Sequence, residues 1–404
     1  MKILFLTTQF PYPIDNGGKH GAINGLKVIA KNNDVTVLSF TEEPFYINEG
    51  VDFFKKQFVN VNFENPIFHS IHIRKKPLKL LIVMLKGFFS KLPYLVTKFE
   101  NRLMYKKIDQ MFSLNNWEIV FIDYLNMWLY GEYIQKKYSN SYSLLILKDH
   151  NIEYEIVKQA ANNSHGIKKN VLNREWRLTK AYEERAIKKA DLVFSVCNEN
   201  TSIIKEINKK SFTMLPTYES KTVYSIRKPS HRILYVGSLS WGANLDGLKW
   251  FVNRVLPKII DKIPDAVLTV VGGGLKQNPF LYNQGVDYKG YLKDISRIYD
   301  DHTVFVVPLF EGSGIRIKIL EAFDNEIAVV STTVGCSTIE AEDGKEIIIA
   351  DDEVNFALGV IELLQNEEKN KQLTINAKSF LRERFGLDKR QDEFKKIIEK
   401  EKNY

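Results

Sequence analysis

The chain alternates short apolar runs with longer stretches in which apolar residues recur at helical spacing. This alternation is typical of a parallel, doubly wound sheet with helices between the strands. The first half predicts strands at Lys2–Thr7, Val35–Phe40, Ile119–Asp123, Leu144–Lys148 and Leu192–Val196. The second half predicts strands at Ile233–Gly237, Ala266–Val271, Val304–Val307, Ala328–Ser331 and Glu346–Ala350.

Between these strands the pattern predicts helices and breaks. A loop containing Gly17 and Gly18 is followed by a predicted helix over 21–31, and a long charged helix is predicted over 170–190. Residues 217–230 are polar, without apolar periodicity, which indicates a linker between an N-terminal domain, 1–216, and a C-terminal domain, 231–385. A charged helix is predicted after the break at Phe385-Gly386, in the last segment, 386–404.

The composition adds the class of protein. With 404 residues, 44% hydrophobic and 26% charged, the chain has the length of two domains and the make-up of a soluble globular protein. Two cysteines far apart, Cys197 and Cys336, suit a reducing cytoplasm and disfavour a disulfide framework or a zinc site. We interpret the apolar start, Met1–Pro13, as a strand and not as a signal peptide, and no stretch is long and apolar enough to span a membrane.

The net charge of +8 is concentrated in one segment. Residues 74–107 hold ten lysines and arginines and one acid, Glu100, around an apolar set that extends from Leu80 to Leu95. A basic amphipathic segment of this kind suits the headgroup region of an anionic membrane. The alternative is a pair of core helices with a solvated basic face. Binding to nucleic acid is not expected, because the charge is local and no known binding motif accompanies it.

The most informative stretch is HTVFVVPLFEGSGIRIKILEAFDNEIAVVST, which starts at His302. It predicts a strand ending at Pro308, a loop with Gly312, Ser313 and Gly314, a helix carrying Arg316, Lys318 and Glu321, and a second strand. The loop would lie at the carboxyl end of a strand, where open α/β sheets bind ligands. Glycines let backbone N–H groups approach an anion at a helix start. Positive side chains there oppose the helix dipole, which suggests that an anionic ligand offsets the conflict; the alternative is a tight turn before solvated helix positions.

This order of features resembles the retaining, nucleotide-sugar-dependent glycosyltransferases of family 4. Two further stretches carry the resemblance: QFPYPIDNGGKHGAINGL from Gln9, and LYVGSLSWGANLDGLKWF from Leu234. The resemblance implies the α/β fold called GT-B, in which two doubly wound Rossmann-like domains face a cleft. It also implies that the last helix, within 386–404, crosses back to the N-terminal domain.

The resemblance also implies the site. The first domain would bind the acceptor and the second the nucleotide sugar. Arg316 and Lys318 would stabilise the charge on the departing diphosphate, and His150, after the strand Leu144–Lys148, would help to align the donor sugar; Asp149 or Glu153 could instead steer the acceptor hydroxyl. Glu321 would accept hydrogen bonds from the ribose hydroxyls. The family has a first glutamate eight positions earlier, where this chain has Ser313, and whether Glu311 takes its role stays open. The remaining donor-binding positions are Gly17, Gly18, Gly237, Ser238, Gly273, Tyr291, Gly312, Ser313 and Gly314.

The expected function is therefore transfer of a sugar from a nucleotide-sugar donor, of UDP or GDP type, to a glycan or lipid-linked acceptor. Capsule or lipopolysaccharide assembly would be the setting, with the protein cytoplasmic and peripheral on the inner face of a bacterial plasma membrane. No metal and no cofactor are expected, because the chain has no D-x-D, P-loop or dinucleotide fingerprint. Two alternatives stay open at this point: a nucleotide-sugar 2-epimerase of the same fold, and a catalytically silent paralogue that acts as an assembly partner.

Overall fold

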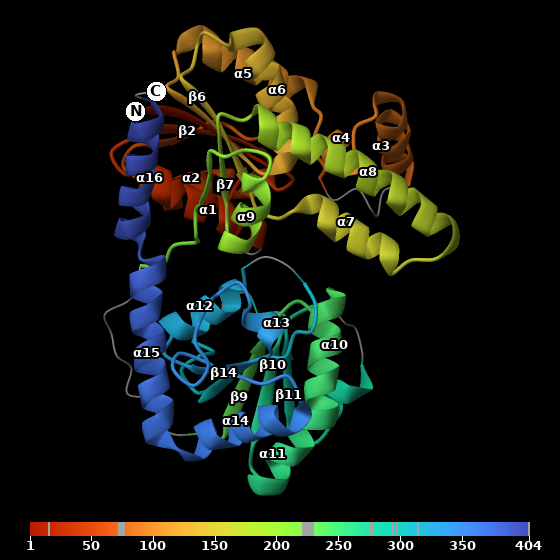
Figure 1. The fold of residues 1–404 in the computed structure, drawn as a ribbon, viewed down its shortest axis with the longest axis vertical. Coiled ribbons are helices and arrows are strands. Elements are labelled where there is room, and N and C mark those ends of the chain that lie inside the picture. Colours follow the sequence, from red (N-terminus) through yellow and green to blue (C-terminus); the bar gives the residue numbers. More distant parts are fainter. Residues whose placement is uncertain are drawn as a thin grey trace. The chain divides into compact units, whose positions relative to one another are not determined.

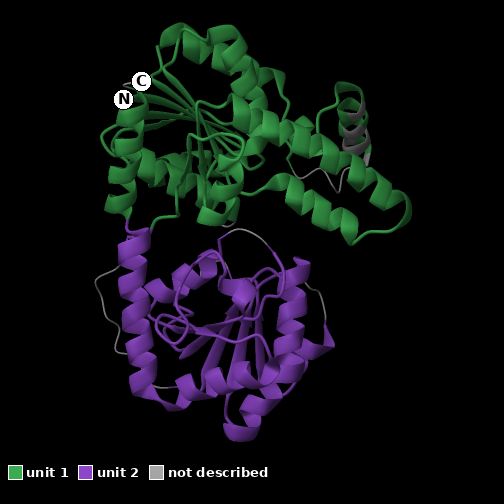
Figure 2. Ribbon diagram, viewed as in Figure 1, with its two compact units in different colours: residues 1–217, 387–404 green, residues 218–386 purple. Residues whose placement is uncertain are grey.

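A computed structural model of the chain describes residues 1–14, 17–71, 77–219, 230–274, 278–292, 295, 297–312 and 315–402 (Figure 1). The chain forms two compact units: Met1–Thr217 together with Leu387–Tyr404, and Tyr218–Gly386 (Figure 2). Most of the segment expected to be a linker, 217–230, lies outside the described residues. The helix after Gly386, α16 (Leu387–Lys402), belongs to unit 1, where it lies against α1 (Gly17–Ile29).

Unit 1 contains a parallel sheet in the order β3-β2-β1-β5-β6-β7-β8, with β4 paired to the end of β2. Its strands are β1 (Lys2–Thr7), β2 (Asp34–Thr41), β3 (Val61–Phe63), β4 (Ile67–Phe68), β5 (Ile119–Asp123), β6 (Leu144–Asp149), β7 (Leu192–Ser195) and β8 (Ser211–Thr213). The connecting helices are α1, α2 (Ile47–Lys55), α3 (Pro77–Ser90), α4 (Tyr94–Thr97), α5 (Arg102–Leu114), α6 (Trp128–Tyr138), α7 (Glu153–Asn162), α8 (Gly166–Lys189) and α9 (Asn198–Lys205), with single 3-10 turns at Pro44–Tyr46 and Leu125–Met127.

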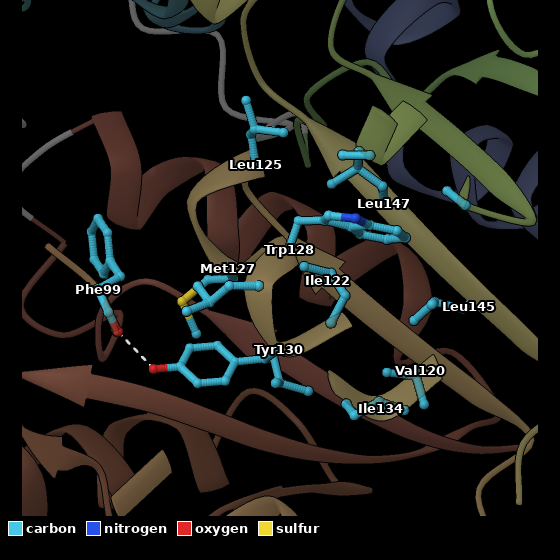
Figure 3. Close-up of a cluster of buried hydrophobic side chains, with 14 of the residues drawn as sticks. Phe99, Val120, Ile122, Leu125, Met127, Trp128, Tyr130, Ile134, Leu145 and Leu147 are labelled. Atoms are coloured by element: carbon cyan, nitrogen blue, oxygen red, sulfur yellow. Dashed lines mark hydrogen bonds between the residues drawn. The ribbon is translucent and has the colours of Figure 1, made fainter. Parts of the chain in front are cut away.

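Alternate residues of the unit 1 strands fill two cores, one on each face of the sheet. Leu4 and Leu6 of β1 point into one core, whereas Ile3 and Phe5 point into the other. The first core is built around Trp128 and Tyr130 of α6, and the Tyr130 hydroxyl donates to the Phe99 carbonyl at 2.6 Å (Figure 3). Phe394 and Ile398 of α16 are buried in the second core. The last helix is therefore part of the core of unit 1.

Unit 2 contains a six-stranded parallel sheet in the order β11-β10-β9-β12-β13-β14. Its strands are β9 (Arg232–Val236), β10 (Val267–Val271), β11 (Val286–Gly290), β12 (Val304–Val307), β13 (Ala328–Ser331) and β14 (Ile348–Ile349). Its helices are α10 (Gly242–Trp250), which continues through a π-helical turn at Phe251–Val255 into α11 (Leu256–Lys262), then α12 (Ile317–Asp324), α13 (Thr333–Cys336), α14 (Glu353–Gln365) and α15 (Glu367–Phe385), with a 3-10 turn at Pro279–Tyr282.

Two of the sequence-based boundaries are wrong for identifiable reasons. Helix α1 begins at Gly17, not at residue 21, because the glycines that suggested a loop lie in its first turn, where Tyr124 donates to the Gly18 carbonyl at 2.9 Å. The strand predicted over 346–350 contains only Ile348–Ile349, because β14 is an edge strand that pairs with β13 over two residues. The structure also contains the strands β3, β4 and β8, which the sequence did not predict as strands.

Gly247 on α10 is a position where only glycine fits. A Cβ atom at Gly247 would lie 1.8 Å from the Pro308 carbonyl oxygen, whereas one at Gly242, in the first turn of the same helix, would meet nothing within 4 Å. We expect Gly247→Ala to destabilise the protein by about 1–3 kcal/mol through overpacking, although alanine favours helix. Gly242→Ala should change the stability by less than about 0.5 kcal/mol. Thermal unfolding of both variants tests this, and equal midpoints would contradict the close contact.

Candidate functional site

In unit 2, two glycine-containing turns meet at the carboxyl ends of the neighbouring strands β9 and β10. The turn after β9 is hydrogen-bonded to the turn after β10: Gly237 N–H donates to the Val271 carbonyl at 2.9 Å, and Leu239 N–H donates to the Gly273 carbonyl at 2.8 Å. A Cβ atom at Gly273 would lie 3.2 Å from the Cβ of Tyr291, whose side chain is largely exposed. The structure thus brings together Gly237, Gly273 and Tyr291, with Ser238 exposed beside them. Ser313 and Gly314 lie outside the described residues.

Lys318 reaches this edge from the first turn of α12. Its ammonium group donates to Asn244 Oδ1 at 3.1 Å and lies 5.1 Å from the centroid of the Tyr235 ring. Asn244 in turn donates to the Ser238 carbonyl at 2.9 Å, so it links the lysine to the turn after β9. Burial, with the nearby Arg316 charge, lowers the pKa of Lys318 to about 7. Glu321 opposes this shift, but burial and the Arg316 charge outweigh it.

The sequence predicted that Arg316 lies inside the helix. In the structure α12 begins at Ile317, and Arg316 is buried at the N-cap position. Its guanidinium group lies 5.8 Å from the Trp241 ring centroid, and burial lowers its pKa. Gly312 approaches both side chains so closely that a Cβ atom would lie 2.8 Å from the Trp241 ring and 2.9 Å from Arg316 Nη2. With φ at +115°, this position requires glycine.

Glu321 lies one turn further along α12. Its carboxylate accepts a hydrogen bond from the Tyr299 hydroxyl at 3.4 Å, and burial raises its pKa to about 7. Glu311 is exposed in the loop before Gly312. The unit 2 edge thus offers two cationic side chains, glycine turns with accessible backbone and one carboxylate. This set can hold an anion such as a diphosphate together with a hydroxyl-bearing group.

In unit 1, His150 lies at the end of β6 inside a buried polar network. Its Nε2 lies 2.7 Å from Asp123 Oδ1, and Asp123 also accepts from Thr7 Oγ1 at 2.8 Å and from Lys148 Nζ at 3.4 Å. The imidazole stacks on the Tyr124 ring with centroids 3.7 Å apart. Burial, with the Lys148 charge, lowers the pKa of His150 to about 4. The neutral ring then donates its Nε2 proton to Asp123.

Helix α1 lies directly over this network. A Cβ atom at Gly21 would lie 2.6 Å from His150 Cε1, and Lys148 donates to the Gly21 carbonyl at 2.8 Å. At the start of the same helix, Gly17 has open space around its Cα, and the first backbone N–H groups of α1 have no partner within the helix. The predicted residues Gly17, Gly18 and His150 thus all belong to or contact α1.

Sequence reasoning missed several residues that hold these groups in place, namely Thr7, Asp123, Tyr124, Lys148 and Tyr235. Asp123 could have been found, because it ends β5 as Asp149 ends β6, and parallel strands bring such ends together. Lys148 also stands out in the sequence, because a charge is unusual inside a predicted buried strand, but the sequence does not show which residue pairs with it. Only its contacts show that it neutralises Asp123.

A second buried polar group adjoins His150. Glu183 of α8 accepts the backbone N–H groups of Glu153 and Tyr154, each at 2.9 Å, and thereby caps the first turn of α7. Burial raises the pKa of Glu183 to about 8, and burial with the Glu183 charge raises that of Asp149 well above its usual value. Each of these two neighbouring buried carboxyl groups thus raises the cost of ionising the other, and Glu183 is fixed by the two backbone N–H groups that it accepts.

Comparison with known proteins gives the fold its name. Residues 230–366 match the family model "Glycosyl transferases group 1". The structure resembles sucrose-phosphate synthase from Thermosynechococcus elongatus (TM-score 0.68, 12% identity, 99% of this chain and 98% of that chain) and the Anabaena protein HepE in complex with UDP (TM-score 0.62, 13% identity, 99% and 100%). The fold is GT-B.

A relative from Klebsiella pneumoniae is 25% identical over 96% of this chain and 97% of its own length, and it is described as an uncharacterized 44.6 kDa protein in the cps region. The family match and the GT-B neighbours together support a glycosyltransferase. Both units of this GT-B protein thus carry clusters of the predicted residues, Arg316, Lys318 and Glu321 in unit 2, and Gly17, Gly18 and His150 in unit 1.

The protonation state of His150 is directly measurable. We expect ¹H–¹⁵N spectra of the histidine side chains to show His150 as the neutral Nε2–H tautomer throughout pH 5.5–8, since its pKa is about 4. His150→Gln identifies the signal by its loss. Because the pKa falls on folding from about 6.5, this residue should reduce the stability of the folded protein as the pH falls from about 6.5 towards 4. An apparent pKa above 6 would contradict the buried network.

The cap that Glu183 forms on α7 predicts a stability difference. Glu183→Ala leaves two backbone N–H groups without their partner and should cost about 1–3 kcal/mol of unfolding free energy. Glu184→Ala is the matched control, because Glu184 is half-exposed and its carboxylate lies 3.8 Å from Lys180. Urea denaturation measures both. Equal losses in the two variants would show that the cap is not important.

Proposed function

We propose that the chain is a retaining glycosyltransferase that transfers a sugar from a nucleotide-sugar donor to a glycan or lipid-linked acceptor in cell-surface polysaccharide biosynthesis. The observation that carries this proposal is the pair of buried or half-buried cations, Arg316 and Lys318, beside glycine turns at the carboxyl edge of the unit 2 sheet. Support comes from HepE, whose structures hold UDP and UDP-glucose, and from the cps region of the Klebsiella relative.

In the proposed reaction the diphosphate accumulates negative charge as the sugar leaves. Arg316 and Lys318 stabilise that charge, so that the protein supplies the role that a metal has in other glycosyltransferases. Glu321 accepts from the ribose hydroxyls, and Gly237, Ser238, Gly273 and Tyr291 border the nucleotide. Gly17, Gly18 and His150 stay our candidates for the sugar-phosphate end of the donor. A neutral imidazole suits this role, because it can accept a hydrogen bond from a sugar hydroxyl through Nδ1.

The proposed reaction also suggests where the acceptor is located. A lipid-linked acceptor would be presented at the inner face of the plasma membrane, and we propose that the protein works there as a peripheral protein. Transfer with retention requires no enzyme nucleophile in this proposal, and none is assigned.

Calorimetric titration with UDP and with GDP tests the donor site. We expect micromolar binding of one nucleotide, and a loss of at least about 100-fold in Arg316→Ala/Lys318→Ala, since each charge-assisted contact is worth about 1.5–3 kcal/mol. Lys262→Ala, at an exposed lysine of α11, is the control and should bind as the wild type does. A folded protein that binds neither nucleotide would favour the silent assembly partner. Release of a free epimerised sugar without acceptor would favour the 2-epimerase.

The pH dependence of nucleotide binding should report Lys318. In the free protein this lysine loses its proton above about pH 7, whereas the bound diphosphate should hold the proton in place. Affinity should therefore fall about tenfold between pH 8 and 9, a range in which Glu321, with a pKa of about 7, is already ionised. Lys318→Arg keeps its charge, so its affinity should stay level over this range. A level profile in the wild-type protein would contradict the assignment.

A further inference from the structure

Helix α3 carries a stripe of exposed apolar side chains on one face. Leu78, Ile82, Leu85 and Phe89 are 71%, 56%, 50% and 80% exposed. Their spacings of four, three and four residues place all of them within about 60° of one another on a helix that turns about 100° per residue. Large apolar side chains are rarely gathered in this way on a surface that faces only water.

The opposite face of α3 is the one that contacts the rest of unit 1. Gly87, about half a turn from the centre of the stripe, is buried, and a Cβ atom there would lie 3.0 Å from the Leu92 carbonyl oxygen and 3.2 Å from Thr97 Oγ1. Helix α4, which receives this contact, is itself anchored, because Val96 and Thr97 are buried and Glu175 of α8 accepts the Tyr94 N–H at 2.8 Å. The close glycine contact thus orients α3 with its apolar stripe outward, at the periphery of unit 1 (Figure 1).

The segment of the sequence that contains α3 is strongly basic. The segment 74–107 has ten basic residues and one acid, Glu100, which pairs with Lys86 at 3.0 Å. Arg102 and Lys106 on α5 are exposed. Excess positive charge next to an apolar stripe matches an anionic lipid surface, where phosphate groups lie directly above acyl chains.

The length of α3 suits a position on a bilayer. Its 14 residues extend about 21 Å at 1.5 Å per residue, short of the roughly 30 Å of a hydrocarbon core. Among the helices in the described part of the chain, none is long and apolar enough to cross a membrane.

We propose that α3 is the membrane-docking element of this protein: Leu78, Ile82, Leu85 and Phe89 enter the headgroup region of an anionic bilayer, and the surrounding lysines and arginines contact lipid phosphates. This proposal deepens the proposed function, because it holds the acceptor-binding unit at the surface where a lipid-linked acceptor is found. The docking proposal does not depend on the donor site, so an experiment can contradict either proposal without contradicting the other.

Flotation with lipid vesicles tests the proposal. The wild-type full chain should float with vesicles of 30% phosphatidylglycerol in phosphatidylcholine, and at least tenfold less with phosphatidylcholine alone or at high salt. Ile82→Ser/Phe89→Ser should lose at least tenfold in partition to the anionic vesicles. Leu358→Ser/Ile375→Ser removes two similarly exposed apolar side chains from α14 and α15 of unit 2 and should float as the wild type does.

Three outcomes would overturn the proposal. The first is a wild-type protein that floats with neither kind of vesicle, and the second is an α3 variant that floats unchanged. The third is a dimer of the wild-type protein in vesicle-free solution that the α3 variant lacks, since a second copy would then cover the stripe. Nucleotide titration of the same variants separates the two proposals: an α3 variant that loses flotation should keep its affinity for UDP or GDP, and a protein without nucleotide affinity can still float.

Discussion

Parallel strand pairing is the constraint on which both halves of this molecule depend. It brings the carboxyl ends of successive strands to one edge of each sheet, so residues far apart in the chain become neighbours there. In unit 1 this edge joins Asp123 of β5 to Lys148 of β6 and to His150, which follows β6. In unit 2 it joins Gly237 after β9 to Gly273 after β10. Glycines then let other backbone or side chains approach closely, as at Gly21 and Gly247.

The two edges handle buried charge differently. In unit 1 the charges are balanced within the protein, because Asp123 is paired with Lys148 and His150 is neutral. In unit 2, Arg316 and Lys318 lie near each other, and the lowered pKa of Lys318 expresses the free-energy cost of holding its charge there. A network whose charges are paired within the protein is suited to keep one geometry. An edge with an excess of positive charge is instead stabilised most when an anionic ligand binds.

Helix α8 connects features that otherwise look independent. Glu175 of α8 accepts the N–H of Tyr94 in α4, the helix that α3 contacts. About two turns further along α8, Glu183 caps the first turn of α7, next to the His150 network. A spacing of eight residues places the two carboxylates just over two turns apart and about 80° from each other around the helix axis. One helix therefore orients both the proposed docking surface and the loop that carries His150.

The sequence by itself determined the α/β fold, because strands buried on both faces are written as unbroken apolar runs: Lys2–Thr7, Ile119–Asp123, Val304–Val307 and Ala328–Ser331 are strands in the structure with the predicted bounds. It also determined that Arg316, Lys318 and Glu321 follow one strand end. Tertiary structure alone decided where α1 begins, that edge strands such as β8 form, and which partners Asp123 and Glu183 have. The physical reason is that contacts between residues distant in the chain stabilise these features: short edge strands, a glycine-rich helix start and buried ion pairs. Such contacts produce no periodic pattern of apolar residues in the local sequence.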